Sequence, residues 1–168
     1  GIILTSLYLP VAAMLIFLIL RGVSFEFRMK ATGWHRELWN RLFFVGSLGA
    51  AIAQGYMLGG VVTGFESGPA YVLFDLLVGV GLAGGYALLG ATWLIMKTEG
   101  PVEQRARRAA PSLLAVLLAF IAGVSLWTPL AIERIAERWF TTPNLYYLAP
   151  VPVLTAVLAW WCWRGIVA

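Results

Sequence analysis

Long apolar blocks that contain no Lys or Arg alternate along this chain with short polar segments. Five such blocks stand out, at about 2–20, 42–63, 71–96, 111–131 and 145–163. A helix needs about 20 apolar residues to cross a hydrocarbon layer roughly 30 Å thick, and none of the blocks alternates as a barrel strand does. The pattern predicts an all-α fold, a polytopic transmembrane helix bundle of about five spans forming a single domain over residues 1–168.

Helix-breaking residues lie near the expected helix ends. Glu66-Ser67-Gly68-Pro69 and Gly100-Pro101 separate neighbouring blocks, and Pro111 suits a first helical turn. Pro150 and Pro152 fall inside the last block, where we expect them to distort its first turns. The chain enters its first apolar block directly at Gly1, so we expect it to be part of a longer protein.

Basic residues are divided unevenly among the connections. Only Arg134 and Arg138 lie in the second and fourth connections. The other ten follow the first, third and fifth blocks: Arg21, Arg28, Lys30, Arg36, Arg41, Lys97, Arg105, Arg107, Arg108 and Arg164. Because short loops rich in Lys and Arg stay on the cytoplasmic side, we expect the N-terminus outside and the loops 21–41 and 97–110 inside.

The composition supports a membrane protein. Hydrophobic residues make up 61% of the chain and charged residues 12%, and the mean hydropathy of +0.84 exceeds that of ordinary soluble domains. The net charge of +4 comes from arginines that flank the membrane. Nucleic acid is therefore not an expected partner.

Asp75 and Gln54 are the candidate functional polar residues within the blocks. An ionisable residue inside a membrane is a functional candidate by default, so Asp75 is either a carboxylate that handles protons or cations near the outer surface, or a shallow carboxylate that its own helix N-terminus stabilises and headgroup water reaches. Gln54 is expected to make an interhelical hydrogen bond, with contact to a cofactor or quinone as the alternative.

Small residues recur at every fourth position in two blocks, which is typical of faces where helix backbones approach closely. We interpret these positions as packing sites. They are Ser47, Ala51, Gly55 and Gly59 in the second block, and Gly81 and Gly85 in the third.

Residues that bind metals or cofactors are scarce. His35 is the sole histidine and is expected in a charged loop, Cys162 is the sole cysteine, and no glycine-rich phosphate loop is present. We therefore predict no catalytic, cofactor-binding or metal-binding residue in this chain, and a buried, unreactive Cys162.

Residues 21–28, RGVSFEFR, place concentrated charge directly after an uncharged block. Its arginines suit positive-inside anchors, and Phe25 and Phe27 suit the headgroup level. Glu26 is less usual at such a boundary, and we expect it to pair with Arg21 or Arg28, a contact of about 0 to 1 kcal/mol if exposed.

Three stretches together resemble subunit II of the cytochrome bd-type quinol oxidases, including the cyanide-insensitive branch. They are LRGVSFEFR, WHRELWNRLFFVGSLGAAIAQGYMLGG and YALLGATWLIMKTEGPVEQRARRAA, within residues 14–110. The resemblance implies an internal portion of a haem-free subunit in the bacterial cytoplasmic membrane. Its signature positions at the inner face are Arg21, Gly22, Phe25, Glu26, Arg28, Thr98, Glu99 and Gly100.

The resemblance also implies the division of labour within the complex. Subunit I carries the b- and d-type haems, oxidises quinol and reduces dioxygen to water, while subunit II supports it and contacts membrane lipids and sometimes quinone. From the residues alone, two alternatives stay open: a fragment of a transporter or channel, and a purely structural membrane scaffold.

Overall fold

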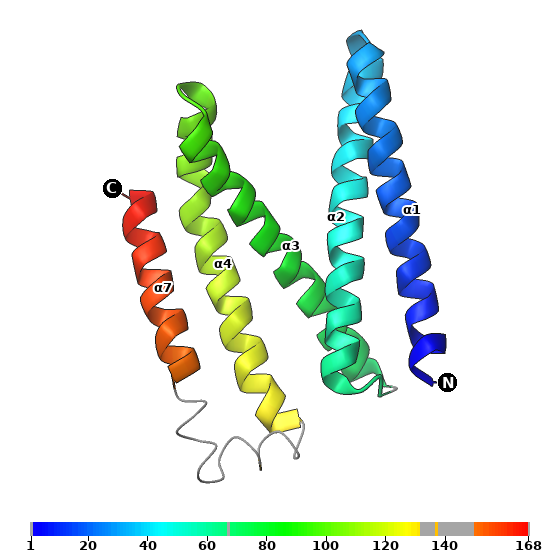
Figure 1. The fold of residues 1–168 in the computed structure, drawn as a ribbon, viewed down its shortest axis with the longest axis vertical. Helices are drawn as coiled ribbons and strands as arrows, with labels where there is room; N and C mark the ends of the chain where they lie inside the picture. Colours follow the sequence, from blue (N-terminus) through cyan, green and yellow to red (C-terminus); the bar gives the residue numbers. More distant parts are fainter. Residues whose placement is uncertain (1, 67, 132–136, 138–149, 168) are drawn as a thin grey trace. The chain divides into compact units, whose positions relative to one another are not determined.

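The computed structural model describes residues 2–66, 68–131, 137 and 150–167. Its regular elements are α-helices joined by short connections (Figure 1). Within these ranges they are α1 (Ile2–Lys30), α2 (Gly33–Thr63), α3 (Pro69–Lys97), α4 (Pro101–Ala131) and α7 (Pro150–Val167). The expected all-α fold is confirmed.

Four of these helices are long and apolar enough to cross a membrane. They cover Thr5–Lys30, Gly33–Thr63, Pro69–Lys97 and Pro101–Thr128, and each overlaps one of the expected spans. Helix α7 is 18 residues long and overlaps the fifth expected span over residues 150–163. Residues 145–149 of that span lie outside the described part, as do Arg134 and Arg138. A polytopic helical bundle fits this arrangement.

The helices are longer than the apolar blocks, so the expected long inner loops are wrong. Helix α1 continues to Lys30 and α2 begins at Gly33, while α3 ends at Lys97 and α4 begins at Pro101. The charged segments can continue as helix because Arg, Lys, Glu and Met are good helix formers. Gly33 and Gly100 adopt positive φ angles of 58° and 77° at the two turns, a conformation that glycine reaches without strain.

Prolines mark three helix starts. Pro69, Pro101 and Pro150 are the first residues of α3, α4 and α7, where the missing N–H would have no partner in the helix. Pro150 and Pro152 therefore occupy the first turn of α7 and do not interrupt it. The expectation for Pro111 is wrong, because α4 begins ten residues earlier.

The described contacts divide the chain into two compact units, residues 1–83 and 84–168. In the first unit, α1 and α2 form a hairpin and lie side by side (Figure 1). Their backbones approach closely at Gly46, where a Cβ would lie 2.9 Å from both the backbone nitrogen of Arg21 and the carbonyl oxygen of Phe17. The missing side chain thus sets the separation of the two helices.

The second close approach in this unit joins α2 to the first half of α3. A Cβ on Gly55 would collide with the backbone of Gly79, and one on Gly59 would lie 2.6 Å from an oxygen of Asp75. Gly55 and Gly59, which we interpret as packing sites from the sequence, lie at these two contacts. Their partner Gly79 was not expected.

The second unit has a small core of its own. The buried residues are Leu88, Ala91, Ala110, Leu114 and Ile166, from the second half of α3, from α4 and from α7. Cys162 is partly buried against this cluster. Gly85 also faces α4, where a Cβ would lie 3.6 Å from Leu117, and its neighbour on the same face, Gly81, is buried at the end of the first unit.

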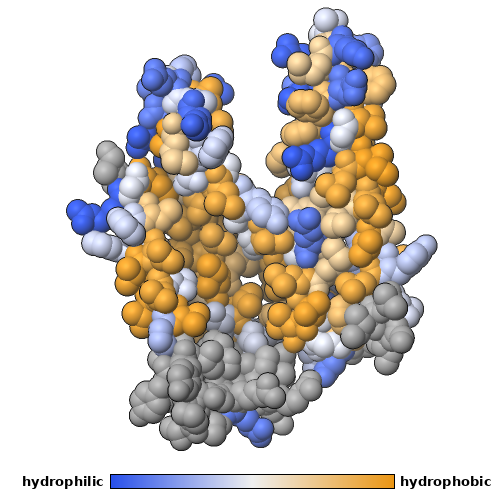
Figure 2. Space-filling model, in the orientation of Figure 1, coloured by the Kyte–Doolittle hydropathy of each residue, from blue (hydrophilic) through white to orange (hydrophobic). Residues whose placement is uncertain are grey.

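Large apolar side chains cover the outer surface of the α1–α2 hairpin, and hydrophilic residues gather at its connected end (Figure 2). Leu9, Ile16, Ile19 and Phe44 each expose half or more of their surface. Exposure of this kind suits a surface in contact with lipid, because lipid tails are as apolar as these side chains.

Gly55→Ala is expected to destabilise the first unit by about 1–3 kcal/mol, because the added methyl group must displace the backbone at Gly79. Gly90→Ala is the matched control, since nothing lies within 4 Å of its Cβ position. That change should be neutral or stabilise the helix by up to about 1 kcal/mol. Thermal unfolding in detergent measures both, and equal effects would contradict the packing assignment.

Candidate functional site

The connected end of the α1–α2 hairpin gathers the first group of signature residues. We call Arg21, Ser24, Phe25, Arg28 and Phe43 the arginine cluster. The guanidinium carbon of Arg21 lies 5.7 Å from the centre of the Phe43 ring, and that of Arg28 lies 5.1 Å from the same ring. Arg28 also lies 5.6 Å from the ring centre of Phe25. One aromatic ring of α2 is thus in cation–π contact with two arginines of α1.

Helical spacing brings these residues together. Arg21, Ser24 and Arg28 follow the three- and four-residue steps that place side chains on one face of a helix, and this face of α1 points toward α2. Ser24 is fully buried, and its hydroxyl has no hydrogen-bond partner within the described residues. Side chains therefore fill the contact between α1 and α2 at the level of Ser24, and Arg21 and Arg28 lie at the edge of this contact.

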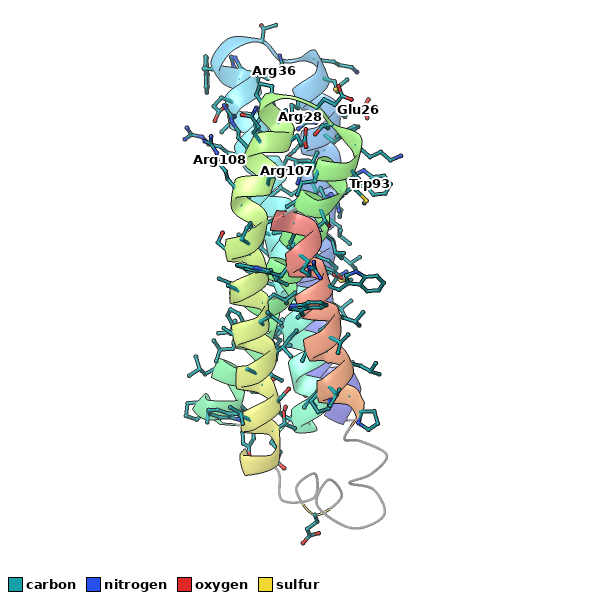
Figure 3. The ribbon with its side chains drawn as sticks, turned by 90° about the vertical axis from the view of Figure 1, so that its left-hand side faces the viewer. Glu26, Arg28, Arg36, Trp93, Arg107 and Arg108 are labelled. Atoms are coloured by element: carbon teal, nitrogen blue, oxygen red, sulfur yellow. The ribbon has the colours of Figure 1, made fainter. Side chains whose placement is uncertain are left out.

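The expected pairing of Glu26 with Arg21 or Arg28 is wrong. An oxygen of Glu26 lies 3.7 Å from the Lys30 nitrogen, and both side chains are more than 70% exposed. Because α1 remains helical to Lys30, residue 30 lies one turn above residue 26 on the same face, whereas residue 28 points elsewhere. Figure 3 shows Glu26 and Arg28 at this end of the hairpin.

Aromatic contacts extend the hairpin end beyond the arginine cluster. The rings of Phe27 and Trp39 stack at 4.9 Å between α1 and α2. His35 lies in the first turn of α2 and not in a loop as expected, and its ring is 4.1 Å from that of Trp34. Both His35 and Trp34 are exposed.

The second signature group, Thr98, Glu99 and Gly100, forms the turn between α3 and α4. The Thr98 hydroxyl donates a hydrogen bond of 2.7 Å to the carbonyl oxygen of Leu94, which also accepts the backbone N–H of Thr98 at 2.9 Å. Gly100 turns the chain with its positive φ. Thr98 and Gly100 thus have a structural role at the end of α3 and in the turn to α4.

Charged residues flank this turn on α4. Arg107 donates a hydrogen bond of 2.8 Å to Glu103, four residues before it. Arg107 and Arg108 lie in the first turns of α4 near the Trp93 end of α3 (Figure 3). Basic residues therefore lie close in sequence to the short turn between α3 and α4, namely Lys97, Arg105, Arg107 and Arg108.

Asp75 is buried between α2 and α3 and is 7% exposed. One of its oxygens has no hydrogen-bond partner within the described residues, and the carboxylate lies against Gly59. Gln54 lies one residue from Gly55 and is partly buried. The structure does not group these two polar residues with either set of signature positions.

An open groove with a volume of about 500 Å³ follows the α1–α2 hairpin. Its lining is mostly apolar and takes in one residue of α3, Leu76. The other lining residues are Ser6, Leu9, Pro10, Ala13 and Phe17 of α1 and Gly49, Ile52, Ala53 and Tyr56 of α2.

Three residues of the arginine cluster and the groove were not identified as site residues from the sequence. Phe43 and Ser24 belong to the arginine cluster, and Phe17 closes the groove by packing on Gly49. The spacing of Arg21, Ser24 and Arg28 could have indicated a shared helix face. No sequence signal identifies Phe43 among the many aromatic residues of the chain.

Within the described residues, no group of three or more His, Cys, Asp or Glu side chains is placed to hold a metal ion. Four apolar helices with charged ends define the protein as a multi-pass helical membrane protein. The chain matches the family described as cytochrome bd terminal oxidase subunit II over residues 1–167. It therefore belongs to this family, as the resemblance indicated.

The curated relatives include cytochrome bd-I ubiquinol oxidase subunit 2 of Escherichia coli K12, which is 28% identical over 145 residues. The proteins with the same description from E. coli O157:H7 and O6:H1 match equally well. The match covers 77% of this chain and 38% of the K12 protein. The chain thus spans less than half the length of these relatives.

Asp75→Asn is expected to raise the free energy of unfolding. The amide keeps the shape of the side chain, and burying an amide without a partner costs less than burying a carboxylate. Glu99→Gln, which changes an exposed carboxylate, is the control and should stay within about 0.5 kcal/mol of wild type. A loss of thermal stability for Asp75→Asn alone would show that a partner outside this chain satisfies the carboxylate.

Proposed function

We propose that this chain is part of a haem-free subunit II of a cytochrome bd-type terminal oxidase. The subunit supports a partner, subunit I, which binds the b- and d-type haems, oxidises quinol and reduces dioxygen to water in the respiratory chain. The chain itself has no catalytic residue. The observation that carries this proposal is the family match over residues 1–167.

The residue chemistry of the chain supports a haem-free role. Haem iron in proteins is commonly held by His, Met, Cys or Tyr from inside a pocket. His35 is exposed at the start of α2, and Cys162 packs against the core of the second unit. Neither position is enclosed as an axial ligand requires.

The positive-inside distribution supports a location in the bacterial cytoplasmic membrane with the N-terminus outside. The α1–α2 and α3–α4 turns then lie on the cytoplasmic side, together with both groups of signature residues. In this arrangement both groups of signature residues lie at the inner face, where Glu26 contacts subunit I. The family match favours this role over a transporter, a channel or an unrelated scaffold.

Copurification with oxidase activity tests the proposal. The full-length subunit that contains this chain is tagged, extracted in detergent and supplied with quinol in an oxygen electrode. We expect oxygen consumption in the pull-down, and none from the subunit expressed without its partner. A pull-down that contains the subunit but neither a second oxidase subunit nor activity would contradict the proposal.

Glu26→Gln tests the inner-face contact. Within the hairpin, Glu26 makes only an exposed pair with Lys30, so its loss should change the stability of the hairpin by less than about 1 kcal/mol. If Glu26 contacts subunit I, oxygen consumption or assembly should nevertheless fall.

Glu37→Gln is the matched control, because Glu37 makes an equivalent exposed pair with Arg41 at 3.3 Å. Activity and assembly are compared for both variants in the purified complex. Equal values for wild type and both variants would reduce Glu26 to an ordinary boundary residue.

A further inference from the structure

Within the part of the chain that the structure describes, two arginines of the arginine cluster have no carboxylate partner. The ion pairs described for the α1–α2 hairpin join Glu26 to Lys30 and Glu37 to Arg41. No carboxylate of the described chain lies within salt-bridge distance of Arg21 or Arg28. Among the described residues, two permanent positive charges that contact the same Phe43 ring therefore lack a carboxylate partner.

The geometry of the two arginines suits a single anionic group. Both guanidinium groups lie within 6 Å of the Phe43 ring centre, so one ring holds both side chains at the rim of the helix contact. A guanidinium that contacts a ring through its face keeps its N–H groups at the edge. These N–H groups match the oxygens of a phosphate.

An apolar groove lies on the same face of α1, on the N-terminal side of the close contact that Phe17 and Arg21 make with Gly46. Ser6, Pro10, Ala13 and Phe17 line it, and the three- and four-residue steps of this series extend to Arg21, Ser24 and Arg28. The groove side of α1 from Ser6 to Phe17 measures about 16 Å at 1.5 Å per residue. An acyl chain in the groove thus approaches the level of the arginines.

We infer that the α1–α2 hairpin binds one anionic phospholipid, with its phosphate between Arg21 and Arg28 and an acyl chain in the groove. Charge complementarity selects the headgroup, because two unpaired cations favour a net negative lipid over a zwitterionic one. The groove selects a ligand with an apolar tail over a free phosphate or an acidic peptide. Because Ser24 is fully buried, the phosphate binds outside the helix contact and on the arginine side chains.

The inference rests on the hairpin alone and goes beyond the proposed role in oxidase assembly. Failure of that role would leave the lipid site intact, and the reverse also holds. The two proposals are tested by different measurements. Oxygen consumption tests the role in the oxidase, and retained lipid tests the phospholipid site.

Native mass spectrometry of the purified complex tests the site. The complex containing the full-length subunit is delipidated in detergent and titrated with phosphatidylglycerol or phosphatidylcholine. We expect phosphatidylglycerol to bind the wild type in preference to phosphatidylcholine. In the double variant Arg21→Gln/Arg28→Gln its binding should weaken by roughly tenfold or more.

Arg41→Gln is the matched control, because Arg41 lies at the same end of the hairpin but is paired with Glu37. It should bind phosphatidylglycerol as the wild type does. Equal weakening by Arg41→Gln and the double variant would overturn the site, since the effect would then be one of general surface charge.

Two further variants keep the test decisive if the double Gln variant does not assemble. Arg21→Lys/Arg28→Lys keeps both charges and should retain the preference for phosphatidylglycerol. Ala13→Phe fills the groove and should weaken binding of both lipids. Unchanged lipid binding in Ala13→Phe, a wild type without preference for phosphatidylglycerol, or a quinone retained in place of phospholipid would each overturn the inference.

Discussion

The close approach of α2 to its neighbours is the interaction on which the first unit depends. Between helices in lipid there is little hydrophobic driving force, so association relies on tight backbone packing and polar contacts. Gly46 brings α2 against the backbone of α1, while Gly55 and Gly59 bring it against α3. The burial of Asp75 and the contact of Phe43 with two arginines both follow from these separations.

Helix length is the second constraint, and it explains why the signature residues form a structured end. A span needs about 20 residues, but α1 to α4 each contain 29 or 31. The surplus turns extend the helices beyond the apolar blocks and carry charged residues at defined helical positions. Arg21, Ser24 and Arg28 can therefore share a face, which residues of a mobile loop could not do reliably.

The sequence predicted the helical class and about five spans, four of which correspond to helices long and apolar enough to cross a membrane, because hydropathy is a local signal. It did not predict that Gly79 meets Gly55, since the register of two helices depends on their crossing and not on either sequence alone. The partner of Glu26 was wrong because the charged segment was taken for a loop. Once that segment is helical, the four-residue spacing leads directly to Lys30.

The central claim is that the chain belongs to a subunit that binds no haem but accompanies one that does. A reduced-minus-oxidised visible spectrum tests it most directly, recorded on the tagged full-length subunit alone and on the complex that it pulls down. The account predicts bands of b- and d-type haem in the complex and none in the isolated subunit. Haem bands in the isolated, folded subunit, or their absence from the complex, would contradict it.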